Sequence, residues 1–304
     1  MASVYVAGHQ GLLGSAVVRR LRRDGHADLV LHPHTELDLR DQRAVREMFA
    51  RDRPRVVVDC AARVGGIGLR RDHPTEFLLD NLEIQNNLIR AAVDARVAAF
   101  VFISSASVYP ADCPQPMREE HLFTGPFEAT QEAYALAKAA GMKLCEYVRT
   151  EYDLSFVSCL PTNLYGEQDE LDPGGAHVIP ALLRRMHDAR LADDPAVTVW
   201  GSGATCRDFL HVDDAADAVV WLLGQERPPA VLNIGTGREV SVRDLAETVQ
   251  RVVGYPGRLV FDASMPEGPR RRLLDVSRAH AAGWRHTIEL EDGLRRLYDR
   301  FLAA

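Results

Sequence analysis

The 304-residue sequence lacks the features that mark several specialised classes of protein. No stretch approaches about 18 uninterrupted apolar residues, so a membrane-spanning helix is not expected. Positive charge is in deficit, with 36 basic against 43 acidic residues, and the formal net charge of -7 predicts a surface that repels nucleic acid. The chain enters an apolar run at Val4 without a basic leader, and no secretory signal is therefore expected.

Cysteines are few and show no pattern. The five are odd in number and widely scattered, without a C-x-x-C pair or the Cys/His spacing of a metal site: Cys60, Cys113, Cys145, Cys159 and Cys206. This usage predicts a reducing, cytoplasmic location and no structural metal. With 46% hydrophobic and 26% charged residues, the composition is that of a globular chain with a full core.

The first half of the sequence alternates short apolar runs with longer amphipathic segments. The expected strands are Val4–Ala7, Leu29–Leu31, Val56–Asp59, Phe100–Ile103 and Phe156–Leu160, and the expected helices are Leu12–Arg23, Gln42–Ala50, Glu76–Arg96 and Glu132–Glu151. Strict alternation predicts an α/β fold with a doubly wound parallel sheet. We expect a Rossmann-like nucleotide-binding core over residues 1–165. Residues 166–304 are expected to form a smaller substrate lobe, with some segments returning to the core.

A glycine-rich turn follows the first expected strand. Gly8, Gly11 and Gly14 have the spacing G-x-x-G-x-x-G, with Gln10, Leu12 and Leu13 between them. Glycines here allow a tight turn and let backbone N–H groups approach a pyrophosphate at a helix N-terminus. The alternative is simple strand-to-helix geometry, because the spacing departs from the standard dinucleotide fingerprint.

The end of the second expected strand carries neither usual marker of cofactor choice. A carboxylate at this point reads the ribose of NAD, and an arginine accommodates the extra phosphate of NADP. Here the segment runs Leu31-His32-Pro33-His34-Thr35-Glu36, and Asp38 comes late for the role. These residues by themselves therefore leave the choice between NAD and NADP open.

Three side chains could converge on a carbonyl group. Tyr134 and Lys138 lie four residues apart in an expected helix and so share one face. An ammonium beside a phenol favours the phenolate, which predicts a tyrosine able to exchange a proton. Ser104 and Ser105 end the fourth expected strand, at the sheet edge where ligands bind. Each feature also occurs as an ordinary turn or helix face, but their order along the chain is much rarer.

Further motifs extend the pattern almost end to end. They are Ala62–Ile67, Asp80–Leu82, Ala133–Ala135, Pro161–Gly166, His177–Ala181, Asp208–Asp214 and Leu273–Val276. Together with the glycine turn and the Ser, Tyr and Lys, these motifs resemble the GDP-L-fucose synthase branch of the extended short-chain dehydrogenase/reductase family. The resemblance implies a nicotinamide-dependent enzyme acting on a nucleotide-linked 4-keto-6-deoxyhexose.

The resemblance also implies roles for individual residues. Ser105, Tyr134 and Lys138 would reduce the ketone at carbon 4, with Tyr134 as proton donor. In the family, a cysteine two residues after the serine and a histidine matching His177 epimerise carbons 3 and 5. That cysteine is Ser107 here, a far weaker base than a thiolate. Cys113 lies beyond a proline and is not expected to replace it.

The family's dinucleotide site matches a defined set of positions. They are Gly8, Gln10, Gly11, Leu12, Leu13, Gly14, His34, Asp38, Leu39, Ser104, Ser105, Lys138, Pro161, Asn163, Leu164 and His177. Where the family carries arginines for the 2'-phosphate, this chain has Gln10 and His34. NADPH is the implied cofactor, and NADH remains an alternative.

Substrate contacts are implied at a second set of positions, namely Ser107, Asn163, Arg185, Trp200 and Arg207, with Arg258 and the run Arg270–Arg272 as weaker additions. Arginine can bind diphosphate oxygens in a bidentate manner. The family also implies a homodimer packed through the helices near Glu76–Arg96 and Glu132–Glu151.

The sequence thus predicts a cytoplasmic reductase of a GDP- or dTDP-linked 4-keto-6-deoxysugar, without efficient epimerase activity. A bifunctional enzyme that both epimerises and reduces is the first alternative. A non-catalytic dinucleotide-binding regulator is the second, which the intact Ser105, Tyr134 and Lys138 disfavour.

Overall fold

A parallel six-stranded sheet forms the centre of the molecule. The computed structural model describes residues 2–169, 177–265 and 268–303. The strands are β1 (Val4–Ala7), β2 (Leu29–Val30), β3 (Val56–Asp59), β4 (Ala99–Ile103), β5 (Ser155–Pro161) and β10 (Val231–Ile234). Their order is β10-β5-β4-β3-β1-β2, and every pairing is parallel. The predicted fold class is confirmed.

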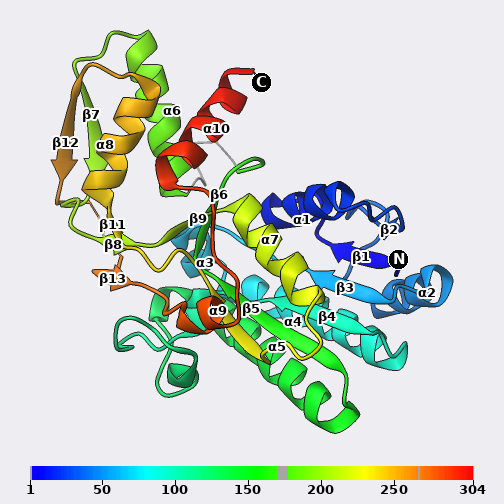
Figure 1. The fold of residues 1–304 in the computed structure, drawn as a ribbon. Coiled ribbons are helices and arrows are strands. Elements are labelled where there is room, and N and C mark those ends of the chain that lie inside the picture. The colour runs from blue at the N-terminus through cyan, green and yellow to red at the C-terminus, as the bar shows by residue number, and fades with distance from the viewer. Residues whose placement is uncertain (1, 170–176, 266–267, 304) are drawn as a thin grey trace.

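Helices cover both faces of this sheet, which is why its strands are almost continuously apolar. Helices α2 (Gln42–Asp52), α4 (Pro74–Asp94) and α5 (Glu132–Tyr152) pack on one face, around Phe49, Leu88 and Met142. Helices α1 (Leu12–Arg23) and α7 (Val212–Leu223) pack on the other, around Val17 and Val219. Figure 1 shows these two layers above and below the strands.

The expected elements of the core agree with the structure to within a few residues. β1, β3 and α1 have the predicted bounds, whereas β2 stops at Val30 and excludes Leu31. α4 begins at Pro74, two residues before the expected start, because proline's fixed backbone angle suits the first position of a helix. A short helix, α3 (Ile67–Asp72), precedes it.

The chain returns to the sheet part-way through the second lobe. β10 pairs with β5 at the sheet edge, and α9 (Ser277–Ala281) packs beside β10. Short elements link the two regions: β6 (Asn163–Tyr165) pairs with β9 (Phe209–His211), and β8 (Cys206–Arg207) lies between β11 (Val240–Ser241) and β13 (Arg271–Arg272).

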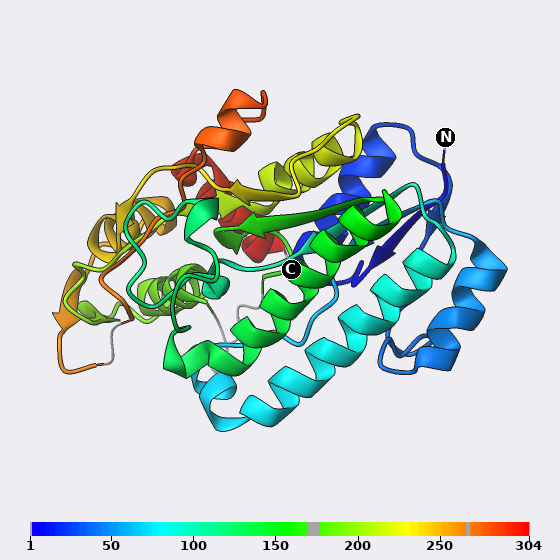
Figure 2. The same cartoon turned by 90° about the horizontal axis from the view of Figure 1, so that it is seen from below.

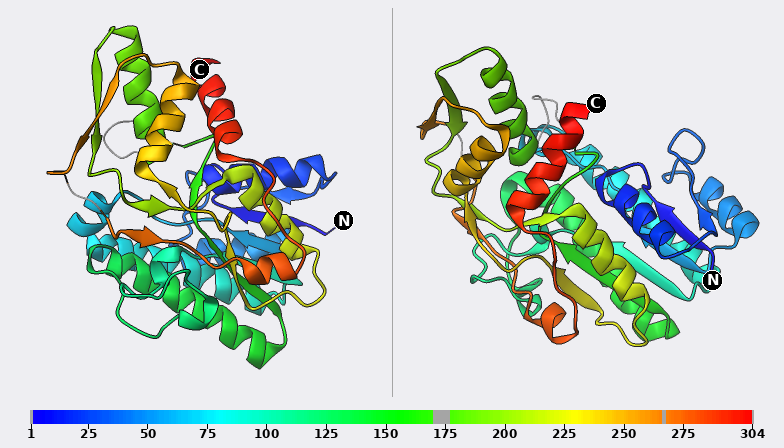
Figure 3. Two further views of the ribbon diagram at one scale, coloured as in Figure 1. Left: turned by 60° about the vertical axis from the view of Figure 1, so that its left-hand side comes forward. Right: turned by 45° about the horizontal axis from the view of Figure 1, so that its top comes forward.

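The smaller lobe has its own apolar core. Helices α6 (Val178–Leu191), α8 (Val242–Val253) and α10 (Leu290–Ala303) surround Leu183, Val249 and Leu294. Parallel strands β7 (Ala196–Trp200) and β12 (Arg258–Asp262) form its outer edge. The two views in Figure 3 show this lobe standing over the carboxyl ends of the core strands.

The strand order reverses direction between β1 and β3, which is where ligands bind in open parallel sheets. The glycine turn follows β1 and the segment Cys60–Gly66 follows β3, so both end at this crevice. No helix among the described residues is long and apolar enough to cross a membrane.

Candidate active site

A cavity of about 1100 Å³ runs between the carboxyl ends of the core strands and the smaller lobe. Almost all residues that the sequence predicted for the site line this one space. They are Gly8, Gln10, Gly11, Leu12, Leu13, Gly14, His34, Asp38, Leu39, Ser104, Ser105, Ser107, Tyr134, Lys138, Pro161, Asn163, Leu164, His177 and Arg207. Arg185, Trp200 and Arg258 do not line it.

The glycine turn has no space for side chains at its two ends. Gly8 has a φ of +71°, and a Cβ at Gly14 would lie 2.1 Å from the Gly8 carbonyl oxygen. Gly11 precedes α1 without a side-chain cap, so the first N–H groups of the helix are left for an anion. These features fit a dinucleotide pyrophosphate at the N-terminus of α1.

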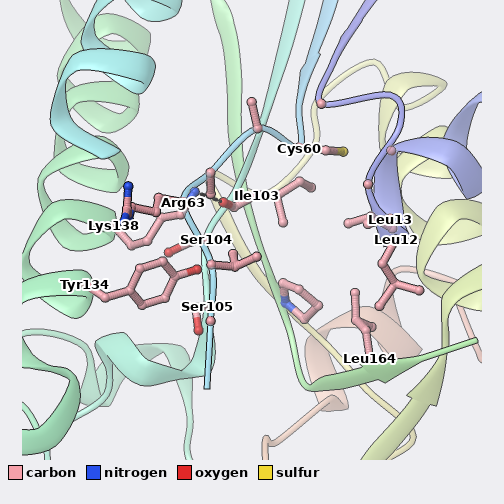
Figure 4. Close-up of a pocket in the computed structure, with 18 of the residues that line it drawn as sticks. Leu12, Leu13, Cys60, Arg63, Ile103, Ser104, Ser105, Tyr134, Lys138 and Leu164 are labelled. Atoms are coloured by element: carbon pink, nitrogen blue, oxygen red, sulfur yellow. Dashed lines mark hydrogen bonds between the residues drawn. The ribbon is translucent and has the colours of Figure 1, made fainter. Parts of the chain in front are cut away.

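The lysine and tyrosine are held on α5 beside the end of β4. The Lys138 ammonium donates a hydrogen bond of 2.9 Å to the Ile103 carbonyl oxygen, and the side chain is buried. Tyr134 is also buried, on the same face of the helix one turn earlier. Figure 4 shows the phenol reaching from α5 toward the segment that carries Ser104 and Ser105. The arrangement can hold a carbonyl oxygen between the serine hydroxyl and the phenol.

Ser107 is tied to Ser105. Its hydroxyl donates a hydrogen bond of 3.0 Å to the Ser105 Oγ, which also accepts the Ser107 backbone N–H at 3.2 Å. Ser105 thereby caps the short 3-10 helix η1 (Ala106–Val108). Because the Ser107 proton points to another hydroxyl and not to a base, the contact does not activate Ser107 as a nucleophile or base.

The alternative thiol does not take the place of the family cysteine. Cys113 does not line the cavity, and its sulfur lies 3.5 Å from the Nδ1 of His121. Burial raises the pKa of this thiol. His177, by contrast, lies in the cavity wall directly before α6.

An arginine that the sequence reasoning missed lies against the tyrosine. The Arg70 guanidinium carbon is 4.3 Å from the centroid of the Tyr134 ring, and Nη1 donates to Gln131 Oε1 at 3.0 Å. The rings of Phe77 and Tyr134 pack in a T-shaped arrangement, with their centroids 6.5 Å apart. Burial lowers the pKa of Arg70. Only folding brings this residue of α3 to α5, and no sequence motif marks it.

Two further arginines line the end of the cavity nearest the smaller lobe. Strands β8 and β13 pair side by side and present Arg207 and Arg272. Burial lowers the pKa of both guanidiniums, and the charge of Arg272 lowers that of Arg207 further. Arg272 also donates a hydrogen bond of 3.1 Å to the Ala106 carbonyl oxygen of η1. Two half-buried cations in mutual repulsion are suited to an anion as highly charged as a diphosphate.

The remaining sequence-based substrate residues lie outside the cavity. Arg185 on α6 stacks on Trp200 of β7, with its guanidinium carbon 5.7 Å from the ring centroid, and Trp200 is 57% exposed. Arg258 instead borders a separate hollow of about 300 Å³ with Arg190 and Tyr255. Because Arg258 lines this second hollow and not the cavity that holds Ser105 and Tyr134, its substrate role stays a prediction that the cavity lining does not support.

A buried carboxyl group lies beneath the lysine. Asp59 ends β3 with its side chain fully buried, accepting the Ala61 backbone N–H at 3.1 Å. Burial raises the pKa of Asp59 to about 6, while the charge of Lys138 opposes the rise. Its second carboxyl oxygen has no hydrogen-bond partner among the described residues.

This group should make stability depend on pH. The folded state retains the Asp59 proton up to about pH 6, whereas the unfolded chain loses it near pH 3.8. Protonated Asp59 therefore favours the folded state fully below about pH 3.8, and this contribution is lost as the pH rises through 6. Relative to an Asp59→Asn variant, the free energy of unfolding should fall by roughly 2 kcal/mol between pH 4 and pH 7. Denaturant titrations at both pH values test this, with exposed Asp28→Asn as control. An equal difference between the proteins at both pH values would contradict it.

Comparison with known proteins places the chain in a family. Residues 4–235 match the NAD dependent epimerase/dehydratase family. The chain belongs to this family. GDP-L-fucose synthase of Escherichia coli (strain K12) is 46% identical over 308 aligned residues, covering 98% of the chain and 96% of the relative. The resemblance to the GDP-L-fucose synthase branch is thereby confirmed.

Solved structures of relatives share the whole fold. A GDP-mannoheptose C4 reductase from Campylobacter jejuni with NADP bound has a TM-score of 0.91 and 32% identity, covering 99% of this chain and 98% of that one. A GDP-L-fucose synthetase from Naegleria fowleri bound to NADP has a TM-score of 0.93 and 27% identity, covering 99% and 93%. Both an enzyme named as a fucose synthetase and one named as a C4 reductase therefore fit this architecture.

Proposed function

We propose that this protein is an NADPH-dependent reductase that converts the carbon 4 ketone of a GDP-linked 4-keto-6-deoxyhexose into an alcohol. The observation that carries the proposal is the meeting of Ser105, Tyr134 and Lys138 in the same cavity as the glycine turn. The GDP- and NADP-linked names of the relatives support the nucleotide and the cofactor.

The chain's own residues account for the acid chemistry. When bound, the reduced nicotinamide supplies the hydride to carbon 4. Tyr134 donates its phenolic proton to the ketone oxygen, and the Ser105 hydroxyl hydrogen-bonds that oxygen as charge develops on it. The Lys138 ammonium, fixed on the Ile103 carbonyl, stabilises the phenolate that remains. The Arg70 guanidinium, which lies over the face of the Tyr134 ring, also stabilises this phenolate.

The diphosphate of the substrate would lie toward the smaller lobe. Arg207 and Arg272 line that end of the cavity, and Arg272 also contacts the η1 segment that carries Ser107. Arg185 and Trp200 lie farther out on the lobe, and their part in holding the nucleotide remains a proposal. The proposed identity of the nucleoside as guanosine rests on the names of the relatives and not on a contact to the nucleobase.

Loss of epimerisation is the second part of the proposal. Abstracting a proton beside a ketone needs a positioned base. The hydroxyl of Ser107 donates to Ser105, and Cys113 is engaged with His121 outside the cavity. A bifunctional synthase is the competing function, favoured by the identity to the Escherichia coli enzyme and by His177 in the cavity wall.

Turnover of defined nucleotide sugars tests the reductase. The protein is incubated with NADPH and the GDP-, dTDP- or UDP-linked 4-keto-6-deoxyhexose, and the product is identified by NMR. We expect cofactor oxidation with the GDP sugar and reduction at carbon 4 alone, with carbons 3 and 5 unchanged. Turnover of only the dTDP sugar would correct the nucleotide, and no turnover of any would refute the reductase.

We further propose a homodimer and a cytoplasmic location. Helices α4 and α5 pack against each other on an outer side of the core, as Figure 2 shows. They expose Leu79, Leu136 and Tyr147, which are 52%, 48% and 59% accessible. Large exposed apolar side chains on adjacent helices indicate an interaction surface. The five unpaired cysteines support a reducing compartment.

The oligomeric state should change when this surface is charged. Tyr147→Arg places a cation where the two helices would meet their copies, and light scattering after gel filtration should show the mass fall from two chains to one. Leu302→Arg, at a 54% exposed position on α10, is the matched control and should leave the dimer intact. A monomeric unmodified protein would refute the dimer.

A further inference from the structure

Three histidines surround the part of the cavity where the adenosine ribose of a dinucleotide lies in this fold. That region is formed by the glycine turn and the tip of the second strand. The turn contributes His9, and the segment after β2 contributes His32 and His34. The inference rests on the proposed function in one respect, namely that the cavity binds a nicotinamide dinucleotide.

The arginine nearest this region is already neutralised. Arg40 lines the cavity, but its guanidinium donates to both Asp38 oxygens, at 3.0 and 2.8 Å, and to Asp80 at 3.4 Å. Arg51 of α2 is likewise paired with Asp52 at 2.7 Å. Among the described residues that line this end, no arginine or lysine is left to meet a ribose phosphate.

His32 is engaged with carboxylates. Its Nε2 lies 2.7 Å from Asp52 Oδ2, and its Nδ1 lies 3.6 Å from Glu36 Oε2. The ring also packs at a tilt on Tyr5 of β1, with centroids 6.4 Å apart. Both ring nitrogens of His32 therefore lie against carboxylates.

Unlike His32, neither His9 nor His34 is paired with a carboxylate among the described residues. The Nδ1 of His9 is buried and has no hydrogen-bond partner among the described residues. Burial lowers the pKa of His9, as do the charges of His32 and Arg22, while Glu36 acts in the opposite direction. His34 is exposed at the cavity wall and interacts electrostatically with Asp38.

We propose that His9 and His34 read the 2'-phosphate of NADP as protonated imidazoliums, so that the preference for NADP over NAD weakens as pH rises. A charge-assisted hydrogen bond from each ring to a phosphate oxygen replaces the bidentate arginine contact. The positive charge comes from a proton taken up on binding and is not permanent.

The direction of the pH effect follows from linkage. A bound dianionic phosphate raises the proton affinity of each histidine, so binding takes up protons and weakens when they become scarce. Each proton taken up contributes at most about tenfold in affinity per pH unit. Below about pH 6 the phosphate itself becomes protonated, and the gain levels off.

Apart from His32, from which the His34→Gln and His9→Asn variants distinguish the two proposed residues, neighbouring groups do not reproduce this signature. Arginine partners lower the pKa of Asp38 and of Asp52, so both stay charged from pH 6 upward, as do Arg22, Arg40 and Arg51. Burial raises the pKa of Cys60 and of Tyr5 away from this range. Burial raises the pKa of Asp59 to about 6, close to this pH range. Asp59 lies near Lys138 and would affect NAD and NADP equally, so its effect drops out of the ratio of their affinities.

Calorimetric titration of the purified protein with NADP and NAD between pH 6.5 and 8.5 tests the inference without any sugar substrate. The preference for NADP, expressed as the Kd of NAD divided by the Kd of NADP, should fall at least about tenfold from pH 6.5 to pH 8.5. The affinity for NAD should stay nearly constant. Repeating the titrations with 2',5'-ADP and 5'-AMP should give the same change, which assigns it to the ribose phosphate.

Variants of the exposed residue separate recognition from folding. His34→Gln should reduce the NADP preference several-fold at pH 6.5 and hardly at all at pH 8.5. His34→Arg should restore the preference and make it less dependent on pH, because a guanidinium keeps its charge. His73→Gln, at an exposed histidine outside the cavity, is the matched control and should behave as the unmodified protein.

A preference that is the same at pH 6.5 and 8.5, or that survives both His34→Gln and His9→Asn, would overturn the inference. Keto-sugar turnover with such a constant preference would leave the proposed function standing. Selective, pH-dependent NADP binding without keto-sugar turnover would refute the function alone.

Discussion

Replacing Tyr134 by phenylalanine should lower the turnover of the keto sugar by about 10²- to 10⁴-fold, the range typical of general acid catalysis. The variant keeps the aromatic ring and loses only the hydroxyl that would give its proton to the ketone oxygen. NADP affinity should change little, because the pyrophosphate contacts come from the glycine turn at Gly8 and Gly14. Single-turnover oxidation of NADPH and calorimetric binding of NADP measure the two effects separately.

The packing around the ring makes this substitution a clean one. Arg70 and Phe77 contact the faces and edges of the Tyr134 ring, which phenylalanine also presents. Tyr152→Phe, at an exposed position near the end of the same helix, is the control and should retain full activity. Unchanged turnover in Tyr134→Phe would refute the acid role. Unchanged biological activity together with normal cofactor binding would favour the non-catalytic regulator.

Local physics was sufficient to predict most of the core. A strand buried on both faces must be continuously apolar, and Val4–Ala7 and Val56–Asp59 stand out from the polar turns beside them. The carboxyl ends of parallel strands meet at one edge, so the order of the glycine turn, Ser105 and Tyr134 along the chain predicts that they share one site. The cavity lining agrees with that placement.

The smaller lobe was less predictable because its contacts join distant segments. Arg207 and Arg272 meet only through β8 and β13, strands of two residues whose pairing leaves no periodic signal. Arg258 has the residue type of a phosphate ligand, but the parallel pairing of β12 with β7 carries it to another hollow. A guanidinium is recognisable in a sequence, whereas the direction in which a short edge strand presents it is not.

Arg70 shows the same limitation within the core. Its position in the short helix α3 would ordinarily be read as a solvated basic turn beside Arg71. Packing of α3 against the short 3-10 helix η3 (Ala129–Gln131), which directly precedes α5, brings the guanidinium onto Tyr134 instead. A contact between residues so far apart in sequence depends on tertiary packing, which residue spacing alone does not describe.

The lack of a thiol beside Ser105 among the described cavity residues is the basis for proposing a reductase without efficient epimerase activity. An unperturbed cysteine has a pKa of about 8.5 and supplies some thiolate near neutral pH, whereas a serine hydroxyl needs a base of its own. Ser107 instead donates to Ser105 at 3.0 Å. Exchange of the protons at carbons 3 and 5 should therefore be very slow, although His177 lines the cavity.

Deuterium incorporation measures that exchange directly. The unmodified protein is incubated with GDP-4-keto-6-deoxymannose in deuterated water without NADPH, and the sugar is analysed by NMR and mass spectrometry against an enzyme-free control. We expect no deuterium at carbons 3 or 5 above that control, and slow incorporation in Ser107→Cys because His177 is still present. Rapid incorporation by the unmodified protein would contradict the account and establish an epimerase as well as a reductase.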